Sequence, residues 1–155
     1  MLYASAKERL FTQHLSISEI IKTIPEEKLY LHPIAGKWSI HDNIAHLARY
    51  QLVFRERLDR ILKTPEHYIE RYIAENDPGF TEWQQKKTPE VMGQLQSERN
   101  LLIQFLVALN NSDLDKSGQH EKFGILKIPE WTEFFLLHEA HHIYTIFQLA
   151  HDRSR

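Results

Sequence analysis

The fold is decided by the stretch PEWTEFFLLHEAHHIYTIFQLAH, residues 129–151. After Pro129 it contains no proline, and its apolar side chains recur at the spacing of an α-helix. Proline suits the first turn of a helix, where its missing N–H would have no partner in any case. The stretch therefore predicts a long helix that runs from Pro129 to about His151.

Two earlier stretches have the same character. Residues 5–24 carry apolar side chains at helical spacing, and Pro25 ends the pattern. The second stretch begins with Ser39, which suits an N-cap, and Asp42 three residues later places negative charge in the first turn. Its apolar stripe continues to about Lys63. We expect a helix in each.

A third stretch completes the set. Thr88 and Pro89 resemble an N-cap followed by a proline at the first helical position, and the apolar pattern then runs to about Leu109. Four helices of some 20 residues in one small chain indicate an all-α four-helix bundle. The length of 155 residues fits a single domain over residues 1–155.

The connections are less regular than the helices. Residues 65–87 could form one or two helical turns, and Asp77, Pro78 and Gly79 together indicate a turn. Residues 112–128 are polar and end in the apolar patch GILKI, which could be a short strand or simply an extended segment.

Composition excludes several classes of protein. There are no cysteines, so disulfides and thiolate metal sites are excluded. The net charge of −2 disfavours a nucleic-acid binder, which would need a basic face. No apolar run approaches the roughly 20 residues of a membrane helix. The first residues, MLYASAKERLFTQHLSIS, lack the basic-then-apolar pattern of a secretory signal, so we expect a cytoplasmic protein.

Histidine is over-represented, with ten residues, and three of them lie in HEAHH at 138–142. His138 and His142 are four residues apart, so they share a helix face, and that face is the apolar stripe. His141 lies about 100° around the helix from His142, so it is a poorer ligand. Two histidines that converge on one apolar face suit an imidazole metal site, although hydrogen-bonded core histidines would give the same pattern.

The string HEAHH also matches HExxH, the motif of zinc proteases, in which the glutamate is the general base. Such a protease would use Glu139 and would need a third ligand further along the chain. The only later histidine is His151, on another face of the same helix. This arrangement disfavours a protease.

A third ligand must therefore come from another helix, and three histidines are available. His46 lies on the flank of its apolar stripe, at the mouth of a bundle. His41 is in the first turn of its helix and is expected to be solvated. His14 shares a face with apolar residues and is expected to be a core histidine. The spacing alone does not choose among the three.

Two segments carry a family resemblance. WSIHDNIAHL at 38–47, preceded by Gly-Lys, and WTEFFLLHEAHHIYTI at 131–146 resemble the second and fourth helices of the DinB-like superfamily, which includes the YfiT type of metalloenzyme. The segment GQHEKFG at 118–124 is similar to that family's connection. Tyr144 and Thr145 stand where members often carry glycine-glutamine, so no substrate contact is carried over there.

The resemblance implies an up-down-down-up bundle and one divalent metal held by His46, His138 and His142. Three imidazoles suit zinc or nickel and leave positions open for water or substrate. The resemblance implies a hydrolase or a low-molecular-weight-thiol-dependent S-transferase that acts on a small molecule, and a possible homodimer.

No catalytic residue is assigned from the sequence. The groups expected near the metal are Asn43, Tyr50, Glu139 and His141, and the carboxylates that could orient the ligands are Asp42, Glu56 and Asp77. The competing hypothesis is a non-enzymatic binding or dimerisation module whose metal is structural or absent. Tyr68, Tyr72 and Trp83 would then form a partner surface, or else lie buried in the core.

Overall fold

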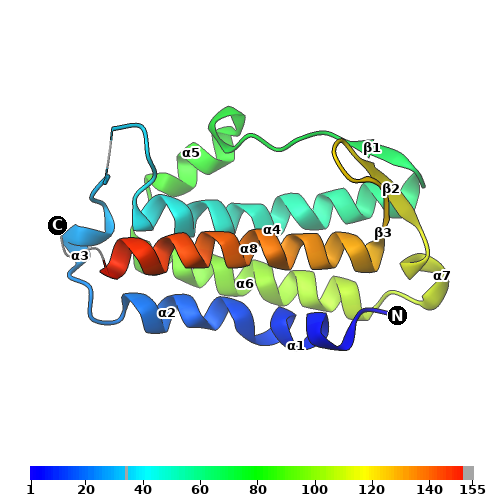
Figure 1. Ribbon diagram of the computed structural model, residues 1–155, viewed down its shortest axis with the longest axis horizontal. Coiled ribbons are helices and arrows are strands. Elements are labelled where there is room, and N and C mark those ends of the chain that lie inside the picture. Colours follow the sequence, from blue (N-terminus) through cyan, green and yellow to red (C-terminus); the bar gives the residue numbers. More distant parts are fainter. Residues whose placement is uncertain (34, 152–155) are drawn as a thin grey trace.

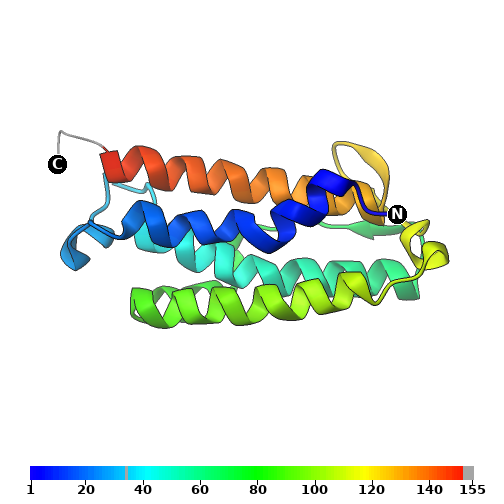
Figure 2. The same cartoon turned by 90° about the horizontal axis from the view of Figure 1, so that it is seen from below.

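Four long helical segments lie side by side in the computed structural model, which describes residues 1–33 and 35–151 (Figures 1 and 2). The first segment is composite, and the others are single helices. They are α1 (Ala4–Thr12), a 3₁₀ turn (Gln13–Leu15) and α2 (Ser16–Ile21), then α4 (Ile40–Lys63), α6 (Thr88–Val107) and α8 (Ile128–His151). The predicted all-α bundle is confirmed.

The direction of the helices follows from the connections. In Figure 1 the α1–α2 segment and α8 run from right to left, whereas α4 and α6 both run from left to right. This is the up-down-down-up order. Because α4 and α6 are parallel, residues 64–87 must return along the whole bundle, and they do so outside α4 through the short helix α5 (Pro78–Gln84).

The start of α4 is fixed by a capping box. The Ser39 hydroxyl accepts a hydrogen bond from the Asp42 N–H at 3.0 Å, and the Asp42 carboxylate accepts one from the Ser39 N–H at 2.9 Å. Two backbone groups that the helix leaves unpaired are thereby satisfied. The predicted N-cap is confirmed, and it sets where every side chain of α4 points.

Two helix boundaries differ from expectation. The first helix was expected to be continuous to Ile24, but it breaks at the 3₁₀ turn and ends at Ile21. Around the break, the hydroxyls of Thr12 and Ser16 donate to the carbonyls of Glu8 and Gln13, and such bonds compete with the helical ladder. In the third helix the N-cap is Lys87 rather than Thr88.

A small three-stranded sheet joins the two connections that flank α6. Its strands are β1 (His67–Ile69), β2 (Ser117–His120) and β3 (Gly124–Lys127), in that order. β1 pairs with β2 in parallel and β2 with β3 antiparallel. β3 lies in the GILKI patch, so the strand is the alternative the structure supports there, whereas β1 and β2 are too short and too polar to show a strand pattern.

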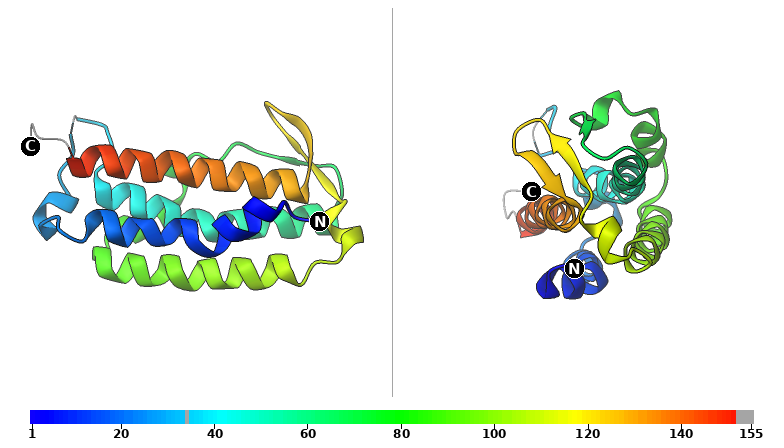
Figure 3. Two further views of the ribbon diagram at one scale, coloured as in Figure 1. Left: turned by 60° about the horizontal axis from the view of Figure 1, so that its bottom comes forward. Right: turned by 90° about the vertical axis from the view of Figure 1, so that its right-hand side faces the viewer.

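The sheet packs over the edge between α4 and α8, as the end-on view of Figure 3 shows. Gly118 makes this approach possible, because a Cβ at that position would lie 2.7 Å from the side chain of Ile61 on α4. A larger residue would push β2 away from the helix. The sheet and the strand connections therefore form a wall beside α4 and α8.

The core has two apolar clusters, one at each end of the bundle. The cluster nearer the sheet includes Phe54, Leu102 and Trp131, and the other includes Ile44 and Ile146. A buried polar layer lies between them. It consists of His14, Gln51, Arg99 and Glu139, together with the partly buried Gln13. Among the described residues, no helix is long and apolar enough to cross a membrane.

Candidate metal centre

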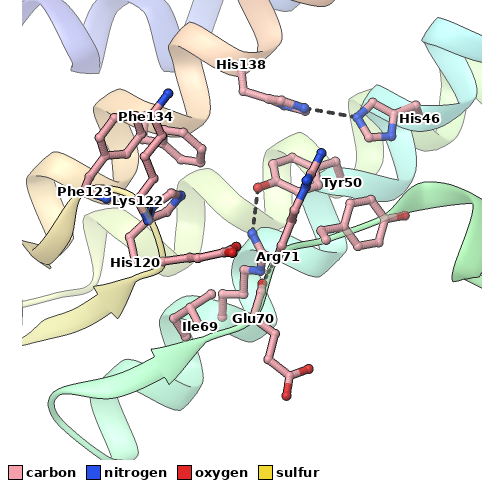
Figure 4. A pocket seen from close by; sticks show the side chains of 13 residues that line it. His46, Tyr50, Ile69, Glu70, Arg71, His120, Lys122, Phe123, Phe134 and His138 are labelled. Atoms are coloured by element: carbon pink, nitrogen blue, oxygen red, sulfur yellow. Dashed lines mark hydrogen bonds between the residues drawn. The ribbon is translucent and has the colours of Figure 1, made fainter.

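Three histidines meet where α4 faces α8. His46 comes from α4, and His138 and His142 come from successive turns of α8. One ring nitrogen from each lies within 4.8 Å of the other two. The Nε2 atoms of His46 and His138 are 3.1 Å apart, as Figure 4 shows. The structure therefore brings together the three residues that the sequence singled out.

The histidines are packed among aromatic rings. His46 is 4% exposed, and its ring lies 4.8 Å from that of Trp38 and 5.9 Å from that of Phe80, measured between centroids. The Tyr50 ring lies 4.4 Å from that of His138. These rings exclude water from one side of the cluster, so a charge placed there would be poorly solvated.

Burial keeps all three imidazoles neutral. Burial first, and then the neighbouring histidines, lower the pKa of His46 to about 2, that of His138 to about 3 and that of His142 to about 4. A neutral imidazole carries one proton and one free lone pair. At pH 7 the cluster therefore presents lone pairs rather than positive charges.

Asn43 selects the tautomer of His142. The Asn43 side-chain amide donates to the Ser39 carbonyl at 2.8 Å, so its oxygen faces the other way. That oxygen accepts the Nδ1–H of His142 at 2.8 Å. The Nε2 lone pair of His142 is then free, which is the usual way in which a ligating histidine is oriented.

In the described chain, the other two histidines bond only each other, through their Nε2 atoms. Within the part of the chain that the structure describes, the buried Nδ1 atoms of His46 and His138 have no partner. Their Nε2 atoms lie 3.1 Å apart, and the third nitrogen of the cluster comes from His142. Buried polar atoms are rarely left in this condition. Three convergent neutral nitrogens fit a divalent cation, because each supplies a lone pair and no proton has to be removed.

The remaining predicted histidines lie elsewhere. His141 is exposed, its ring meets that of His142 edge-on, and it is not one of the three clustered histidines. His14 is 3% exposed and bonds Gln96 at 3.1 Å, which confirms a core histidine.

The expectation of a solvated His41 is wrong. This side chain is 2% exposed; its Nε2–H donates to the Gln84 carbonyl at 3.0 Å and its Nδ1 bonds the Thr88 hydroxyl at 2.9 Å. The residues that cover it belong to α5 and the start of α6, segments whose position the sequence does not reveal.

Glu139 points away from the cluster, about 100° around α8 from His138. Its carboxylate is fully buried, pairs with the Arg99 guanidinium and accepts from the Gln13 amide at 2.8 Å. Arg99 also donates to the Gln51 side chain at 2.8 Å and to the Leu10 carbonyl at 2.9 Å. The HExxH reading therefore fails on geometry, because the carboxylate that would act as base is occupied in the core.

The three candidate orienting carboxylates also lie elsewhere. Asp42 belongs to the capping box and accepts from Gln84 at 2.8 Å. Asp77 binds Arg49 at 2.7 Å and the Tyr72 hydroxyl at 2.9 Å. Glu56 is exposed. The amide of Asn43, rather than a carboxylate, performs this role for His142.

A cavity of about 710 Å³ opens onto the cluster, with His46 and His138 in its wall (Figure 4). Its other walls are the outer part of α4, the chain after β1 and the β2–β3 hairpin. A second cavity of about 580 Å³ reaches His142 from the other side, between Trp38 and Leu149. The sequence identified Tyr50 near the site, but gave no signal for the polar residues of the hairpin.

Fold and site together define a class: small up-down-down-up helical bundles that carry a histidine cluster between the second and fourth helices. The chain belongs to the DinB superfamily, whose sequence model matches residues 14–146. The predicted resemblance is thereby confirmed.

A comparison with solved structures supports the same fold. The chain is similar to YfiT from Bacillus subtilis, which is described as a probable metal-dependent hydrolase with an unusual four-helix bundle topology. The TM-score is 0.80 at 16% identity, over 94% of this chain and 84% of that one. At that identity the likeness shows the fold alone. No curated protein matches the chain.

Proposed function

We propose that the protein is a metal-dependent enzyme that binds one divalent ion through Nε2 of His46, His138 and His142. The observation that carries the proposal is the convergence of three neutral imidazole nitrogens on the wall of a cavity. Three protein ligands leave coordination positions for water or substrate, as in catalytic sites. Zinc or nickel suits this donor set.

Each part of the site has a role in the proposed reaction. A metal held by the three histidines would lower the pKa of a water or thiol toward neutrality and so supply a nucleophile. Asn43 holds His142 in the ligating tautomer. Phe80 packs against His46, while Tyr50 and Trp38 pack against the histidines and border the two cavities. The cavity admits a small-molecule substrate to the open side.

We favour a hydrolase, in line with the description of YfiT, with thiol-dependent S-transfer as the second candidate chemistry. The thiol co-substrate, the homodimer, the single domain and the cytoplasmic location stay predictions. The alternative of a non-enzymatic binding module is supported by Leu137 and Tyr144, which share a face of α8 and are 58% and 60% exposed.

Elemental analysis tests the central claim. The protein, purified without chelator and then dialysed against zinc or nickel, is expected to hold about one ion per chain, and His142→Ala to hold much less. His151→Ala is the matched control, because His151 lies on the same helix but is exposed and outside the cluster. Wild-type protein that takes up no stoichiometric metal would overturn the proposal.

The reaction is tested by comparing substrates on the metal-loaded protein. Ester and amide panels report hydrolysis, and pairs of a small thiol with an electrophile report transfer. Activity that depends on the metal and is lost in His142→Ala supports an enzyme. Metal uptake without activity on either panel, together with concentration-dependent dimerisation that Tyr144→Lys abolishes, would favour the binding module.

A further inference from the structure

The cavity in front of His46 and His138 carries unpaired positive charge. Three cations line it, namely Arg57, Arg71 and Lys122. Among the described residues, none of the three has a carboxylate oxygen within 4.0 Å. Four arginines elsewhere do have such a partner, because Arg9, Arg49, Arg55 and Arg99 each contact a carboxylate.

Arg57 is held in place without losing its charge. One terminal nitrogen donates to the Tyr50 hydroxyl at 2.8 Å and the other to the Glu70 carbonyl at 2.6 Å. The guanidinium also lies 5.6 Å from the centroid of the Tyr50 ring. Both hydrogen-bond partners are neutral acceptors, and three of its five N–H groups remain for a ligand. Such a fixed guanidinium suits a planar oxyanion.

Arg71 faces the same space from the other wall. It follows β1 in extended chain, where successive side chains point to opposite sides. In Figure 4 the side chain of Arg71 extends toward the histidines, whereas that of Glu70 extends away from them. The cavity also contains one further carboxylate, that of the exposed Glu121. Three cations therefore line the cavity against two carboxylates.

Two neutral side chains, those of His120 and Tyr50, can also donate hydrogen bonds to a ligand in the cavity. The Nδ1 atom of His120 accepts from the backbone N–H groups of Lys122 and Phe123, at 3.0 and 3.2 Å. Its proton therefore sits on Nε2, in a ring that lines the cavity. The Tyr50 hydroxyl accepts from Arg57, so its own proton is available for another acceptor. Phe123 and Phe134 supply aromatic surface beside these donors.

We propose that this cavity binds its ligand through an oxyanion, a carboxylate or a phosphate carried on an aromatic or apolar body, held between Arg57 and Arg71. Tyr50 and His120 donate to the same group, and the apolar body packs on the phenylalanines. The inference rests on the proposed function only in naming this ligand as the substrate that reacts beside His46 and His138. A volume of about 710 Å³ is that of a pocket for a small organic molecule.

Calorimetric titration of the chelator-treated, metal-free protein tests the proposal. The probes are 2-naphthoate, 2-naphthyl phosphate and the neutral 2-naphthamide. We expect at least one anion to bind about tenfold more tightly than the amide, because hydrogen bonds to charged groups are the stronger ones. Which anion binds better distinguishes a carboxylate ligand from a phosphate ligand.

The variants are Arg71→Gln and Arg57→Gln, each expected to weaken anion binding about tenfold and to leave amide binding unchanged. Arg60→Gln is the matched control. Arg60 lies about one turn after Arg57 on α4 but does not line this cavity, so the variant removes the same charge outside the proposed site. Arg71 is exposed and makes no ion pair within the described chain, so its variant keeps the test valid if Arg57→Gln fails to fold.

Several results would overturn the proposal: equal binding of amide and anions, no binding of any probe at millimolar concentration, or anion binding indifferent to both arginines. Anion binding that appears only with added zinc and ignores Arg71 would overturn it and leave the proposed function standing. Arginine-dependent binding in a protein that never takes up metal would support the pocket and overturn the proposed function.

Discussion

Adjacent residues of α8 belong to two buried polar clusters of opposite character. Glu139 points into the middle of the bundle, where Arg99, Gln51 and Gln13 satisfy its carboxylate. His138 points about 100° around the helix from it, to histidines whose nitrogens bond one another or have no partner among the described residues. One cluster is closed by hydrogen bonds within the chain, and the other is open.

The difference separates a structural cluster from a binding site. A buried ion pair with complete hydrogen bonding needs nothing further, and its members tie α4, α6 and α8 together. A buried cluster with free lone pairs is stabilised only when something binds to it. Substitutions should therefore affect folding in the first cluster and ligand binding in the second.

The largest effect is expected from Glu139→Gln. The Arg99 charge would then be buried without its partner, which costs about 3–5 kcal/mol of unfolding free energy, measured by urea denaturation. Glu133→Gln is the matched control, because its ion pair with Arg9 is partly exposed and contributes roughly 1 kcal/mol or less. Loss of metal binding in Glu139→Gln without loss of stability would contradict the separation of the two clusters.

The apolar replacement Arg99→Met with Glu139→Leu sharpens the same comparison. It removes both charges together, so most of the stability lost in Glu139→Gln is expected to return. Urea denaturation of the double variant beside the single one measures the difference. A double variant no more stable than Glu139→Gln would show that the hydrogen bonds to Gln51 and the Leu10 carbonyl matter more than the charge.

Metal should act on the open cluster alone. Zinc at 100 times its Kd is expected to raise the unfolding free energy by about 2.7 kcal/mol, because it binds the native state and not the unfolded chain. His138→Ala is expected to abolish the increment, and Glu139→Gln to keep it. Urea denaturation with zinc and with chelator measures both. An undiminished increment in His138→Ala would place the metal elsewhere.

Asn43→Ala is expected to have a smaller effect. Losing the acceptor for Nδ1 of His142 should weaken metal affinity about 10–100-fold, or about 1.4–2.7 kcal/mol, with little change in metal-free stability. Competition with a fluorescent chelator measures it. Asn43→Asp keeps an acceptor and is expected to retain most of the affinity; a loss equal to that of Asn43→Ala would count against the role of this contact.

The effect that is smallest at neutral pH, and grows only as the pH falls, concerns His14, which lies beside the closed cluster. Burial, and then the charge of Arg99, lower its pKa from 6.5 to about 4. Between these values the unfolded chain binds more protons than the folded one, so stability falls as pH falls from 6.5 to 4. Urea titrations of metal-free protein across this range should show a shallower slope in His14→Leu. The exposed His151→Leu should match wild type, and equal slopes in all three proteins would contradict the prediction.

The parts of the molecule that were predictable from sequence depend on short-range patterns. The apolar stripe of α8 places His138 and His142 on one face, and Ser39 with Asp42 fixes the start of α4. Both follow from residues within a few positions of each other. The third histidine, His46, came from the family resemblance, because helix spacing did not distinguish it from the other candidates.

The parts that were missed depend on partners far along the chain. His41 is buried by α5 and α6, more than 40 residues away, and Glu139 is neutralised by Arg99 across the bundle. The position of Arg71 depends on β1 pairing with a strand some 50 residues later. No local pattern reports such contacts, so the closed cluster and the outer cavity wall had to come from the structure.

The parallel pairing of β1 with β2 also bears on how the substrate of this fold could change during evolution. The outer walls of the cavity come from connecting segments, which are joined by the few backbone hydrogen bonds between β1 and β2. The histidines instead come from two helices that also form the core. Connections accept insertions and substitutions far more readily than core helices do. The metal-binding residues can therefore stay the same while the substrates change. Exchanging residues 67–72 and 118–124 between relatives is the direct way to redesign which substrates the scaffold accepts.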